Sequence, residues 1–277
     1  MTTVGDGPIV VSGATGNVGG EVVAALVSRG ARVRALTRDP GRRPAPPGAA
    51  WAPGDLDRPA SLASALEGAA ALFLLPGFAD MAGIVEQART QGARRVVLLS
   101  GRSAGRRDLD DAITTYMRDS ETAVRQGGLA WTILRPGALM SNVLAWAPSV
   151  RRDEAFPVPF AWSPVAAIDP ADVAGVAARA LLDGEHAGET LEITGPEALS
   201  AVHRARALAA RLGRPVRLRP LEGEAARDHV LATVPQPYAD ALLSFSLDGT
   251  LDESPVLPTV AQVLGRPART FGHWVEA

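Results

Sequence analysis

The sequence predicts an α/β protein whose core is a doubly wound parallel sheet. A short run of β-branched residues, Ile9-Val10-Val11, is followed by a glycine-rich turn and then by apolar residues at helical spacing. Strand-like and helix-like segments go on alternating over the first two-thirds of the 277 residues. Because strands that alternate with helices imply right-handed parallel crossovers, the pattern favours this fold class.

Each element is predicted from the spacing of its apolar residues. The first helix is expected over 18–27, and Gly30 ends its pattern. The elements expected after it are, in chain order, a strand over 31–37, a strand over 70–75, a helix over 81–91, a strand over 95–100, a helix over 109–126, a strand over 131–134, a helix over 171–182, a strand over 189–194, a helix over 199–212 and a short strand over 216–219. Turn residues follow several of them, such as Pro76-Gly77 and Gly127-Gly128.

The first turn, Gly13 to Gly19, reads GATGNVG. Gly13 allows a tight turn, Gly16 lets the backbone approach a pyrophosphate, and Gly19 lets the helix pack closely on the strand. The N-terminus of that helix presents unpaired amides and the positive end of its dipole to an anion. Thr15 and Asn17 are expected to add hydrogen bonds. The alternative, a turn without a ligand, is disfavoured by the strand, helix and second strand around it, so the loop predicts a dinucleotide site.

The character of the chain changes beyond residue 140. Residues 145–170 have an irregular pattern rich in proline and aromatic residues, and the tail from Pro237 on is predicted as helices broken by prolines. We therefore expect a dinucleotide-binding core over 1–140 and a small α+β substrate lobe over 141–277. Some segments of that lobe are expected to return to the core sheet.

The end of the second predicted strand bears on the choice of cofactor. An acidic residue there would hold the ribose 2′-hydroxyl, whereas an arginine favours a 2′-phosphate. Arg38 and Asp39 stand side by side, with Arg38 first, and Arg42 and Arg43 follow. We therefore expect NADP(H) in preference to NAD(H). The alternative is that Arg38 is a solvated surface charge, since the chain contains no lysine and all 28 Lys+Arg residues are arginine.

Composition excludes several classes of chemistry. Without cysteine or lysine the chain has no disulfide, thiol nucleophile or Schiff-base residue. The net charge of −2 gives no reason to expect a nucleic acid or a membrane surface as partner. No run approaches the length of a membrane span and no secretory signal is recognisable, so we expect a cytoplasmic protein with a small-molecule substrate. The four histidines lie far apart and predict no metal site; the oligomeric state is left open.

Several motifs together resemble the NmrA-like, atypical short-chain dehydrogenase/reductase family, which includes NADPH quinone reductases and NADP(H)-sensing regulators. The resemblance covers nearly the whole chain. It rests on the glycine loop and on LTRD at 36–39, GDLD at 54–57, VVLLS at 96–100, WTILRPG at 131–137, IDPADVA at 168–174 and LEITGP at 191–196. It implies a Rossmann fold, with the substrate lobe contributed by the later segments.

The resemblance also implies where the cofactor lies. In parallel sheets, ligands bind beyond the carboxyl ends of the strands. The arginine that matches Arg38 contacts the 2′-phosphate in the family, the segments near 55 and 75 flank the adenosine, and those near 100 and 136 lie near the nicotinamide. The expected cofactor-binding residues are Gly13, Thr15, Gly16, Asn17, Val18, Gly19, Arg38, Asp55, Leu56, Leu74, Leu75, Pro76, Ser100, Gly101, Pro136 and Gly137.

The catalytic pattern departs from that of the wider superfamily. The standard reductases use Tyr-x-x-x-Lys, but here Tyr116 is followed four residues on by Ser120. Without a neighbouring cation, a tyrosine with a pKa of about 10 is a poor base at neutral pH, although it can donate a proton. We expect Tyr116 and Ser100 to be catalytic, with Ser103 as an alternative to Ser100. The opposing interpretation is that Tyr116 is an ordinary helix residue. Glu121 is expected in a structural or substrate-orienting role.

These observations predict an NADPH-dependent oxidoreductase that reduces a small, flat, apolar carbonyl compound such as a quinone or enone. Such a substrate needs little acid catalysis when it is positioned over the nicotinamide. The residues expected to contact it are Tyr116, Met140, Trp146, Phe160 and Trp162, unless the aromatic segment is only a packed crossover. The alternative function is a non-catalytic NADP(H)-binding redox sensor or regulator.

Overall fold

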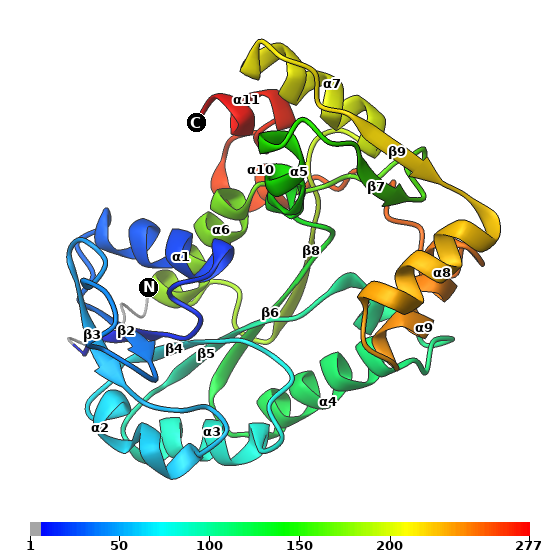
Figure 1. Ribbon diagram of the computed structural model, residues 1–277. Helices are drawn as coiled ribbons and strands as arrows, with labels where there is room; N and C mark the ends of the chain where they lie inside the picture. Colours follow the sequence, from blue (N-terminus) through cyan, green and yellow to red (C-terminus); the bar gives the residue numbers. More distant parts are fainter. Residues whose placement is uncertain (1–6) are drawn as a thin grey trace.

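The computed structural model describes residues 7–277, and its largest feature is a seven-stranded parallel sheet with helices on both faces (Figure 1). The strand order is β3-β2-β1-β4-β5-β6-β8. The strands are β1 (Ile9–Val11), β2 (Val33–Thr37), β3 (Ala49–Pro53), β4 (Ala71–Leu74), β5 (Arg95–Leu99), β6 (Ala130–Pro136) and β8 (Glu189–Ile193). The chain order reverses between β1 and β4, and ligands of doubly wound sheets bind at this switch point.

The sheet is buried on both faces, because successive side chains of each strand point in opposite directions. In β1, Ile9 and Val11 pack with α1 (Asn17–Val27) and α6 (Pro170–Asp183), whereas Val10 packs on the other side. That second face is covered by α2 (Ala63–Leu66), α3 (Met81–Thr90) and α4 (Ala112–Gln126). Two apolar cores of β-branched residues, leucine and alanine therefore hold the strand ends in place.

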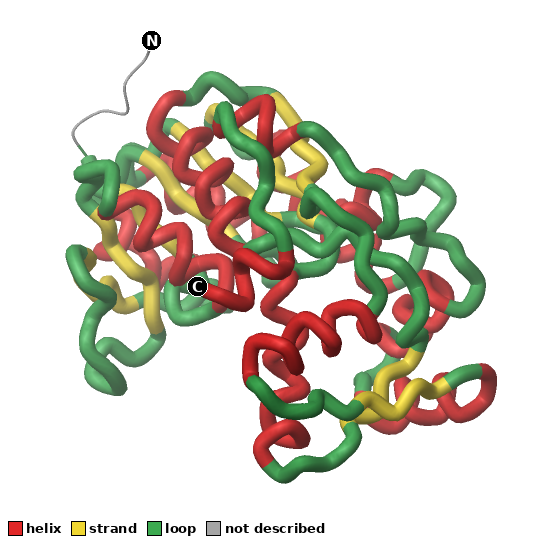
Figure 2. The backbone as a smooth tube through the Cα atoms, turned by 90° about the horizontal axis from the view of Figure 1, so that it is seen from above, coloured by secondary structure: helices red, strands yellow, loops and turns green. Residues whose placement is uncertain are grey.

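A smaller lobe lies beyond the carboxyl edge of the sheet. It contains a separate two-stranded parallel sheet, seen apart from the main one in Figure 2. Its elements are α5 (Ala147–Arg151), β7 (Phe156–Pro159), α7 (Ala201–Leu212), β9 (Leu218–Leu221), α8 (Gly223–Thr233), α9 (Tyr238–Ser246) and α11 (Phe271–Glu276). Helix α10 (Thr259–Leu264) lies between α9 and α11 in the chain but packs on α6 and β8 of the core. Short 3-10 turns are η1 (Pro59–Leu62), η2 (Arg102–Gly105) and η3 (Met140–Trp146). Both α6 and β8 follow residue 140 in the chain but belong to the core.

The predicted fold class is confirmed, and the differences are local. The helix expected from residue 109 begins at Ala112, because the carboxylate of Asp111 accepts the backbone N–H of Thr114 at 2.9 Å and caps it there. β3 and α8 were not expected, and the segment over 145–170 is not irregular throughout, since it contains α5 and β7. β3 is an edge strand of alanine, tryptophan and proline, which has little of the usual strand signal.

Two further observations concern the described part of the chain. None of its helices has the length and apolar character needed to cross a membrane. Over the same residues, no three histidine or carboxylate side chains are grouped so that they could hold a metal ion.

Candidate cofactor and substrate site

The glycine loop between β1 and α1 has the geometry that a pyrophosphate needs. Gly13 has φ +63°, in the left-handed region that favours glycine. A Cβ on Gly19 would collide with the carbonyl oxygen of Gly13, so only glycine lets α1 pack this closely on the turn. Gly16 precedes α1, and no side chain of the described residues caps that helix, so the amides of its first turn are free to bind an anion. These features fit the diphosphate of a dinucleotide.

The remaining loop residues divide between the ligand side and the core. Thr15 and Asn17 are exposed, whereas Val18 is buried against the sheet and anchors α1. Of the side chains in this loop, those of Thr15 and Asn17 are therefore the ones free to hydrogen-bond a phosphate.

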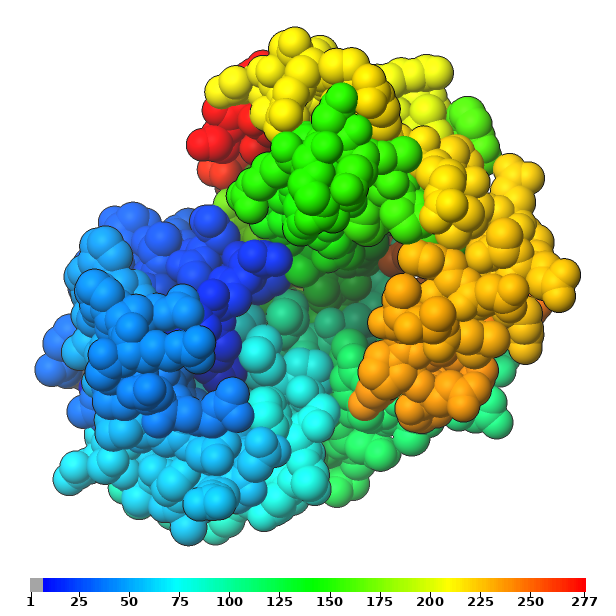
Figure 3. All heavy atoms as spheres, viewed as in Figure 1, coloured from blue at the N-terminus to red at the C-terminus, as the bar shows by residue number. Residues whose placement is uncertain are grey.

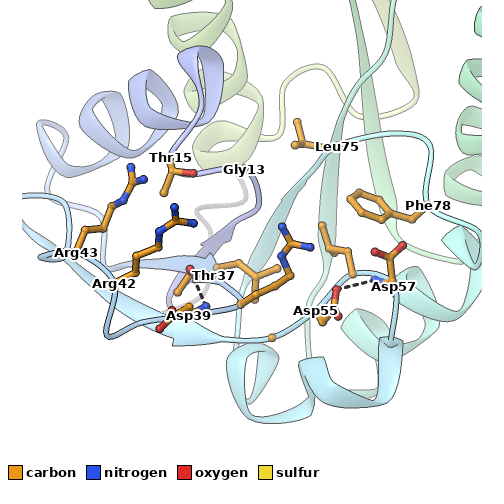
Figure 4. Close-up of a pocket in the computed structure, with 14 residues that line it drawn as sticks. Gly13, Thr15, Thr37, Asp39, Arg42, Arg43, Asp55, Asp57, Leu75 and Phe78 are labelled. Atoms are coloured by element: carbon orange, nitrogen blue, oxygen red, sulfur yellow. Dashed lines mark hydrogen bonds between the residues drawn. The ribbon is translucent and has the colours of Figure 1, made fainter. Parts of the chain in front are cut away.

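A groove of about 350 Å³ opens beside the glycine loop, at the carboxyl ends of β2 and β3 (Figure 4). Arg38, Arg42 and Arg43 line one side of it, and all three come from the end of β2 and the loop that follows. In Figure 4 the side chains of Arg42 and Arg43 point toward Gly13 and Thr15. The groove therefore joins the free helix amides to a set of guanidinium groups.

Asp39 lies in the same loop, but its carboxylate already has a structural partner. Its Oδ1 accepts the backbone N–H of Gly41 at 3.1 Å, while its own N–H donates to Thr37 Oγ1 at 3.2 Å. The indole Nε1 of Trp51 on β3 donates to the carbonyl oxygen of Arg43 at 2.9 Å and ties the far end of the loop to the sheet. The loop thus presents three guanidinium groups to the groove while the Asp39 carboxylate holds a turn.

The opposite side of the groove is more apolar and can face an adenine ring. Leu56, Leu75 and Phe78 line it, and Asp55 bounds it at the end of β3. Leu74, which was expected to flank the adenosine, is fully buried in the core beneath. At this strand end, Leu75 is therefore the leucine that faces the groove.

A second groove, of about 430 Å³, lies next along the carboxyl end of β4. It is lined by Pro76, Gly77, Ile113, Tyr116 and Tyr238. The rings of Tyr116 and Tyr238 meet edge to face, with their centroids 6.1 Å apart. Burial, and to a smaller extent the neighbouring Tyr238, raise the pKa of Tyr116 above its ordinary value, so its phenol is protonated at neutral pH and can donate a proton.

Ser120 stands where the wider superfamily has lysine, but it acts on the backbone. Its hydroxyl donates to the carbonyl oxygen of Tyr116 at 2.7 Å and accepts the N–H of Gly77 at 3.0 Å. Gly77 has φ +89°, and it packs so closely on the Tyr116 ring that a Cβ at this position would lie 3.2 Å from Tyr116 Cδ2. Ser120 therefore fixes the turn after β4 over the tyrosine.

A buried ion pair lies under the ends of β5 and β6. The Ser100 hydroxyl donates to Glu121 Oε1 at 2.6 Å, and Arg135 donates to both carboxylate oxygens at 2.8 and 2.7 Å. Arg125 adds a second cation, with its Nη1 3.0 Å from Glu121 Oε2. Burial opposes ionisation of Glu121, but the hydrogen bonds from Arg135 and Ser100 and the charges of Arg135 and Arg125 outweigh it and hold its pKa below the usual range.

The other residues expected near the nicotinamide lie at the same edge. Gly101 follows β5, and Pro136 and Gly137 end β6. The backbone N–H of Ser100 donates to Leu134 O at 2.7 Å, so the ends of β5 and β6 are bonded side by side. The structure thus brings Ser100, Gly101, Pro136 and Gly137 together, whereas Ser103 is buried within η2.

The aromatic residues expected to line the substrate are not brought together in one wall. Met140 and Trp146 are buried in the core of the lobe, where the Trp146 and Phe156 rings lie 6.3 Å apart. Phe160 packs against the small apolar cluster of α8 and α9. Trp162 is 58% exposed and lines a different groove, between α7 and β9. Tyr116 is the one of these five that lines the groove beside β4.

Sequence reasoning missed several lining residues. Tyr238 begins α9, far along the chain from Tyr116, and no spacing links the two. Phe78 follows the predicted strand over 70–75, so reading two residues beyond Pro76 would have included it. Asp57 ends the GDLD motif at 54–57, directly after the expected Asp55 and Leu56. Ile113 lies one turn before Tyr116 on α4, and the helical pattern could have found it.

Comparisons with known proteins agree with a dinucleotide site at the glycine loop. A family model described as NAD(P)H-binding matches residues 13–184. The chain is 39% identical, over 96% of both chains, to (4-alkanoyl-5-oxo-2,5-dihydrofuran-3-yl)methyl phosphate reductase of Streptomyces griseus. It is 35% identical, over 97% of both, to the NAD(P)H azoreductase of Xenophilus azovorans.

Solved structures of other proteins have the same fold as this chain. The NADPH-dependent quinone oxidoreductase QOR2 of Escherichia coli, complexed with NADPH, superposes with a TM-score of 0.76 at 25% identity, over 97% of this chain and 98% of that one. The negative transcriptional regulator Nmra shares the fold, with a TM-score of 0.71 at 17% identity, over 97% and 94% of the two chains. The chain therefore belongs to the NAD(P)H-binding family and is an NAD(P)H-dependent oxidoreductase.

Proposed function

We propose that this protein uses NADPH, in preference to NADH, to reduce a small electron-poor conjugated acceptor such as a quinone or an enone. The observation that carries the proposal is the continuity of the two grooves along one strand end. Leu75 lines the groove beside the glycine loop, and the next two residues, Pro76 and Gly77, line the groove of Tyr116 and Tyr238. A cofactor in the first groove and a flat acceptor in the second would therefore be neighbours.

The choice of NADPH rests on the loop after β2. Three guanidinium groups line the groove there, and planar guanidinium groups match phosphate oxygens in charge and geometry. The carboxylate of Asp39, the group that would accept from a ribose 2′-hydroxyl, has its Oδ1 engaged with the Gly41 N–H and shares the groove with the three guanidinium groups. This balance favours a 2′-phosphate.

The acceptor class rests on the chemistry of the second groove and on the relatives. Two tyrosine rings, a proline and an isoleucine form an apolar, partly aromatic surface that suits a flat molecule. The relatives are named for activity on an acyl dihydrofuranone, an azo compound and a quinone, all of which are conjugated acceptors. Such compounds take up hydride with little help from an acid.

The chemistry requires one hydride and one proton. Bound NADPH supplies the hydride. The Tyr116 phenol, which burial keeps protonated, is the proton donor that lines the acceptor groove, and it would protonate the acceptor oxygen as charge develops there. The Ser100 hydroxyl already donates its hydrogen bond to Glu121, so its oxygen is left to act as an acceptor.

The test is steady-state oxidation of NADPH, followed at 340 nm, with a panel of quinones, enones and simple aldehydes. We expect saturable turnover with the conjugated acceptors, little with the aldehydes, and a higher kcat/KM with NADPH than with NADH. Calorimetry run in parallel measures cofactor binding. Tight NADPH binding without turnover of any acceptor would overturn the proposal and favour a redox sensor.

A further inference from the structure

Arg204 on α7 is a largely buried guanidinium without a partner. Its neighbours on the helix, Ala201 and Ala205, are buried in the core of the lobe and turn this face of α7 inward. The Nε of Arg204 is shielded from solvent, and no group within residues 7–277 accepts a hydrogen bond from it. Burial is also the main cause that lowers the pKa of Arg204. A buried cation in this state is costly unless it binds something.

The nearest carboxylate does not neutralise Arg204. Glu253 lies on the segment between α9 and α10, and its Oε1 accepts the backbone N–H of Ala138 at 3.1 Å. No ion pair within 4 Å joins the two side chains in the described structure, although their charges act on one another. Burial raises the pKa of Glu253 despite that hydrogen bond and the charges of Arg102 and Arg204, and both guanidinium groups lie close enough to act on its carboxylate.

A second guanidinium, that of Arg102, reaches the same place from η2. Its side chain is 11% exposed, and its Nε has no hydrogen bond in residues 7–277. Its Nη1 donates weakly to Asp252 O at 3.3 Å. Its Nε lies 3.7 Å from Glu192 Oε2, in an ion pair without a hydrogen bond, and the other oxygen of that carboxylate, Oε1, lies 3.9 Å from Arg135 Nη1. Arg102 and Arg204, each with a buried Nε that finds no hydrogen-bond acceptor within residues 7–277, thus flank the Glu253 carboxylate.

Glu253 and Arg102 lie beside the segment that follows β6. The Glu253 carboxylate accepts the N–H of Ala138, two residues after the end of β6, and the carbonyl oxygen of Glu253 accepts the N–H of Ala166 at 2.8 Å. The Arg102 side chain runs past Gly137, since a Cβ there would lie 3.6 Å from its Cδ. Figure 3 shows the molecule hollowed between the blue-to-cyan core and the green and orange lobe, with atoms of the orange-red segment after α9 at the back.

We propose that Arg204, with Arg102 beside it, forms an anion subsite that binds a phosphate monoester carried by the acceptor. The inference rests on the proposed function only in taking the acceptor as the ligand. Guanidinium groups bind phosphate oxygens through paired, charge-assisted hydrogen bonds, which would use the donors left open here. The subsite would hold the remote end of the acceptor and leave its conjugated end toward the Tyr116 groove.

The test compares two probes that differ in the phosphate alone, a butenolide with a phosphomethyl substituent and the same butenolide with a free hydroxymethyl. Calorimetry in saturating NADP⁺, which cannot supply hydride, gives each Kd without turnover. We expect Arg204→Met to raise the Kd of the phosphate ester at least tenfold and to change that of the alcohol less than twofold. Arg204→Lys, which keeps the positive charge, should raise the Kd of the phosphate ester less than Arg204→Met does. Arg206→Met, on the exposed face of the same helix, should change neither.

Stability separates a binding role from a structural one. Because Arg204 has an unused buried donor, Arg204→Met should leave the Tm unchanged or raise it. If Arg204→Met lowers the Tm and weakens the binding of both probes equally, Arg204 has a structural role and the inference is overturned. Equal affinity of the wild-type protein for the ester and the alcohol would also overturn it. Inorganic phosphate should compete with the ester weakly; if it binds as tightly, the site takes free phosphate and the inference fails. Binding of the ester without NADPH turnover would instead contradict the proposed function and leave the subsite standing.

Discussion

The hydroxyl of Ser100 is bonded to the carboxylate of Glu121 at 2.6 Å, under the ends of two strands that border the expected nicotinamide site. Arg135 holds that carboxylate through two further hydrogen bonds. Because the Ser100 proton is directed to a carboxylate that stays ionised, the lone pairs of its oxygen are left to face a ligand. We therefore expect Ser100 to accept a hydrogen bond from the cofactor or acceptor, and Tyr116 to be the proton donor.

Glu121→Gln should destabilise the protein strongly. The carboxylate is 1% exposed and Arg135 15% exposed, so the substitution leaves a largely buried guanidinium with Glu192, 3.9 Å away, as its remaining charge partner. Breaking such a pair costs about 3 kcal/mol, which urea unfolding can measure. Glu86→Gln removes a pair with Arg89 in which both side chains are at least half exposed, and it serves as the matched control. That control should change the free energy of unfolding by less than about 0.5 kcal/mol; equal losses in the two variants would contradict the account.

The same pair predicts a pH dependence. The pKa of Glu121 is lower in the folded protein than in the unfolded chain, so its contribution is complete above the unfolded pKa of about 4.3 and is lost as the pH falls through the folded value. The difference in unfolding free energy between wild type and Glu121→Gln should be constant from pH 7 to pH 5 and smaller at pH 4. A difference that grows on acidification would be inconsistent with an ionised Glu121.

Two neighbouring glycines of α1 should respond in opposite ways to alanine. At Gly19 the new Cβ would collide with Gly13 O, whereas at Gly20 the nearest atom, Ala14 O, is 3.5 Å away. Gly19→Ala should therefore lower the free energy of unfolding by more than about 2 kcal/mol and weaken NADPH binding. Gly20→Ala should be neutral or stabilising by up to about 1 kcal/mol, because alanine favours helix. Denaturant unfolding and NADPH titration of both variants check this pair.

Arg38→Ala should discriminate between the two cofactors. Loss of a guanidinium that binds the 2′-phosphate should raise the Kd of NADPH at least about tenfold, while the Kd of NADH should change less than about twofold because NADH lacks that group. Titration of intrinsic fluorescence gives both constants. Arg89→Ala, remote from the groove and paired with Glu86, should alter neither. Equal effects of Arg38→Ala on the two cofactors would show that Arg38 is a surface charge.

Tyr116→Phe should slow the reaction without weakening cofactor binding. The phenol donates in its protonated form, and its pKa lies above the ordinary value of about 10, so kcat of the wild type should be constant from pH 6 to pH 9. Because these acceptors need little help from an acid, the variant should lose less in kcat with an enone than the roughly 100-fold typical of a removed general acid, and less still with a quinone, whose own electronics drive the transfer. An unchanged kcat with every acceptor would make Tyr116 a wall of the groove and no more.

The sequence predicted the parts of this site that depend on local patterns. Gly13 and Gly19 could be assigned roles because a strand, a turn and a helix follow one another directly, and the structure places both as expected. Arg38 could be placed because the carboxyl ends of neighbouring parallel strands lie at one edge of the sheet, so the end of the second strand lies beside the ligand of the glycine loop. Contacts between distant segments could not be read in this way. The pairing of Tyr116 with Tyr238 depends on how α9 packs on α4, and periodicity within either helix does not report it.

The aromatic segment illustrates the same limit. Trp146 and Trp162 belong to one proline-rich stretch, yet the first is buried in the lobe and the second faces solvent. The difference depends on α7 and β9, which come later in the chain. They belong to the same apolar cluster as Trp146, whereas Trp162 lies at an open groove between them. Composition alone indicated an apolar surface and could not say which side chains would face a ligand.

The central claim, direct transfer of hydride from NADPH to the acceptor, is tested most directly with NADPH deuterated at C4 and an enone acceptor in one turnover. The account predicts that the deuterium on the transferred face appears at a carbon of the reduced product, detected as a gain of one mass unit. Wild-type protein that binds both ligands but yields an unlabelled product, or none, would contradict it.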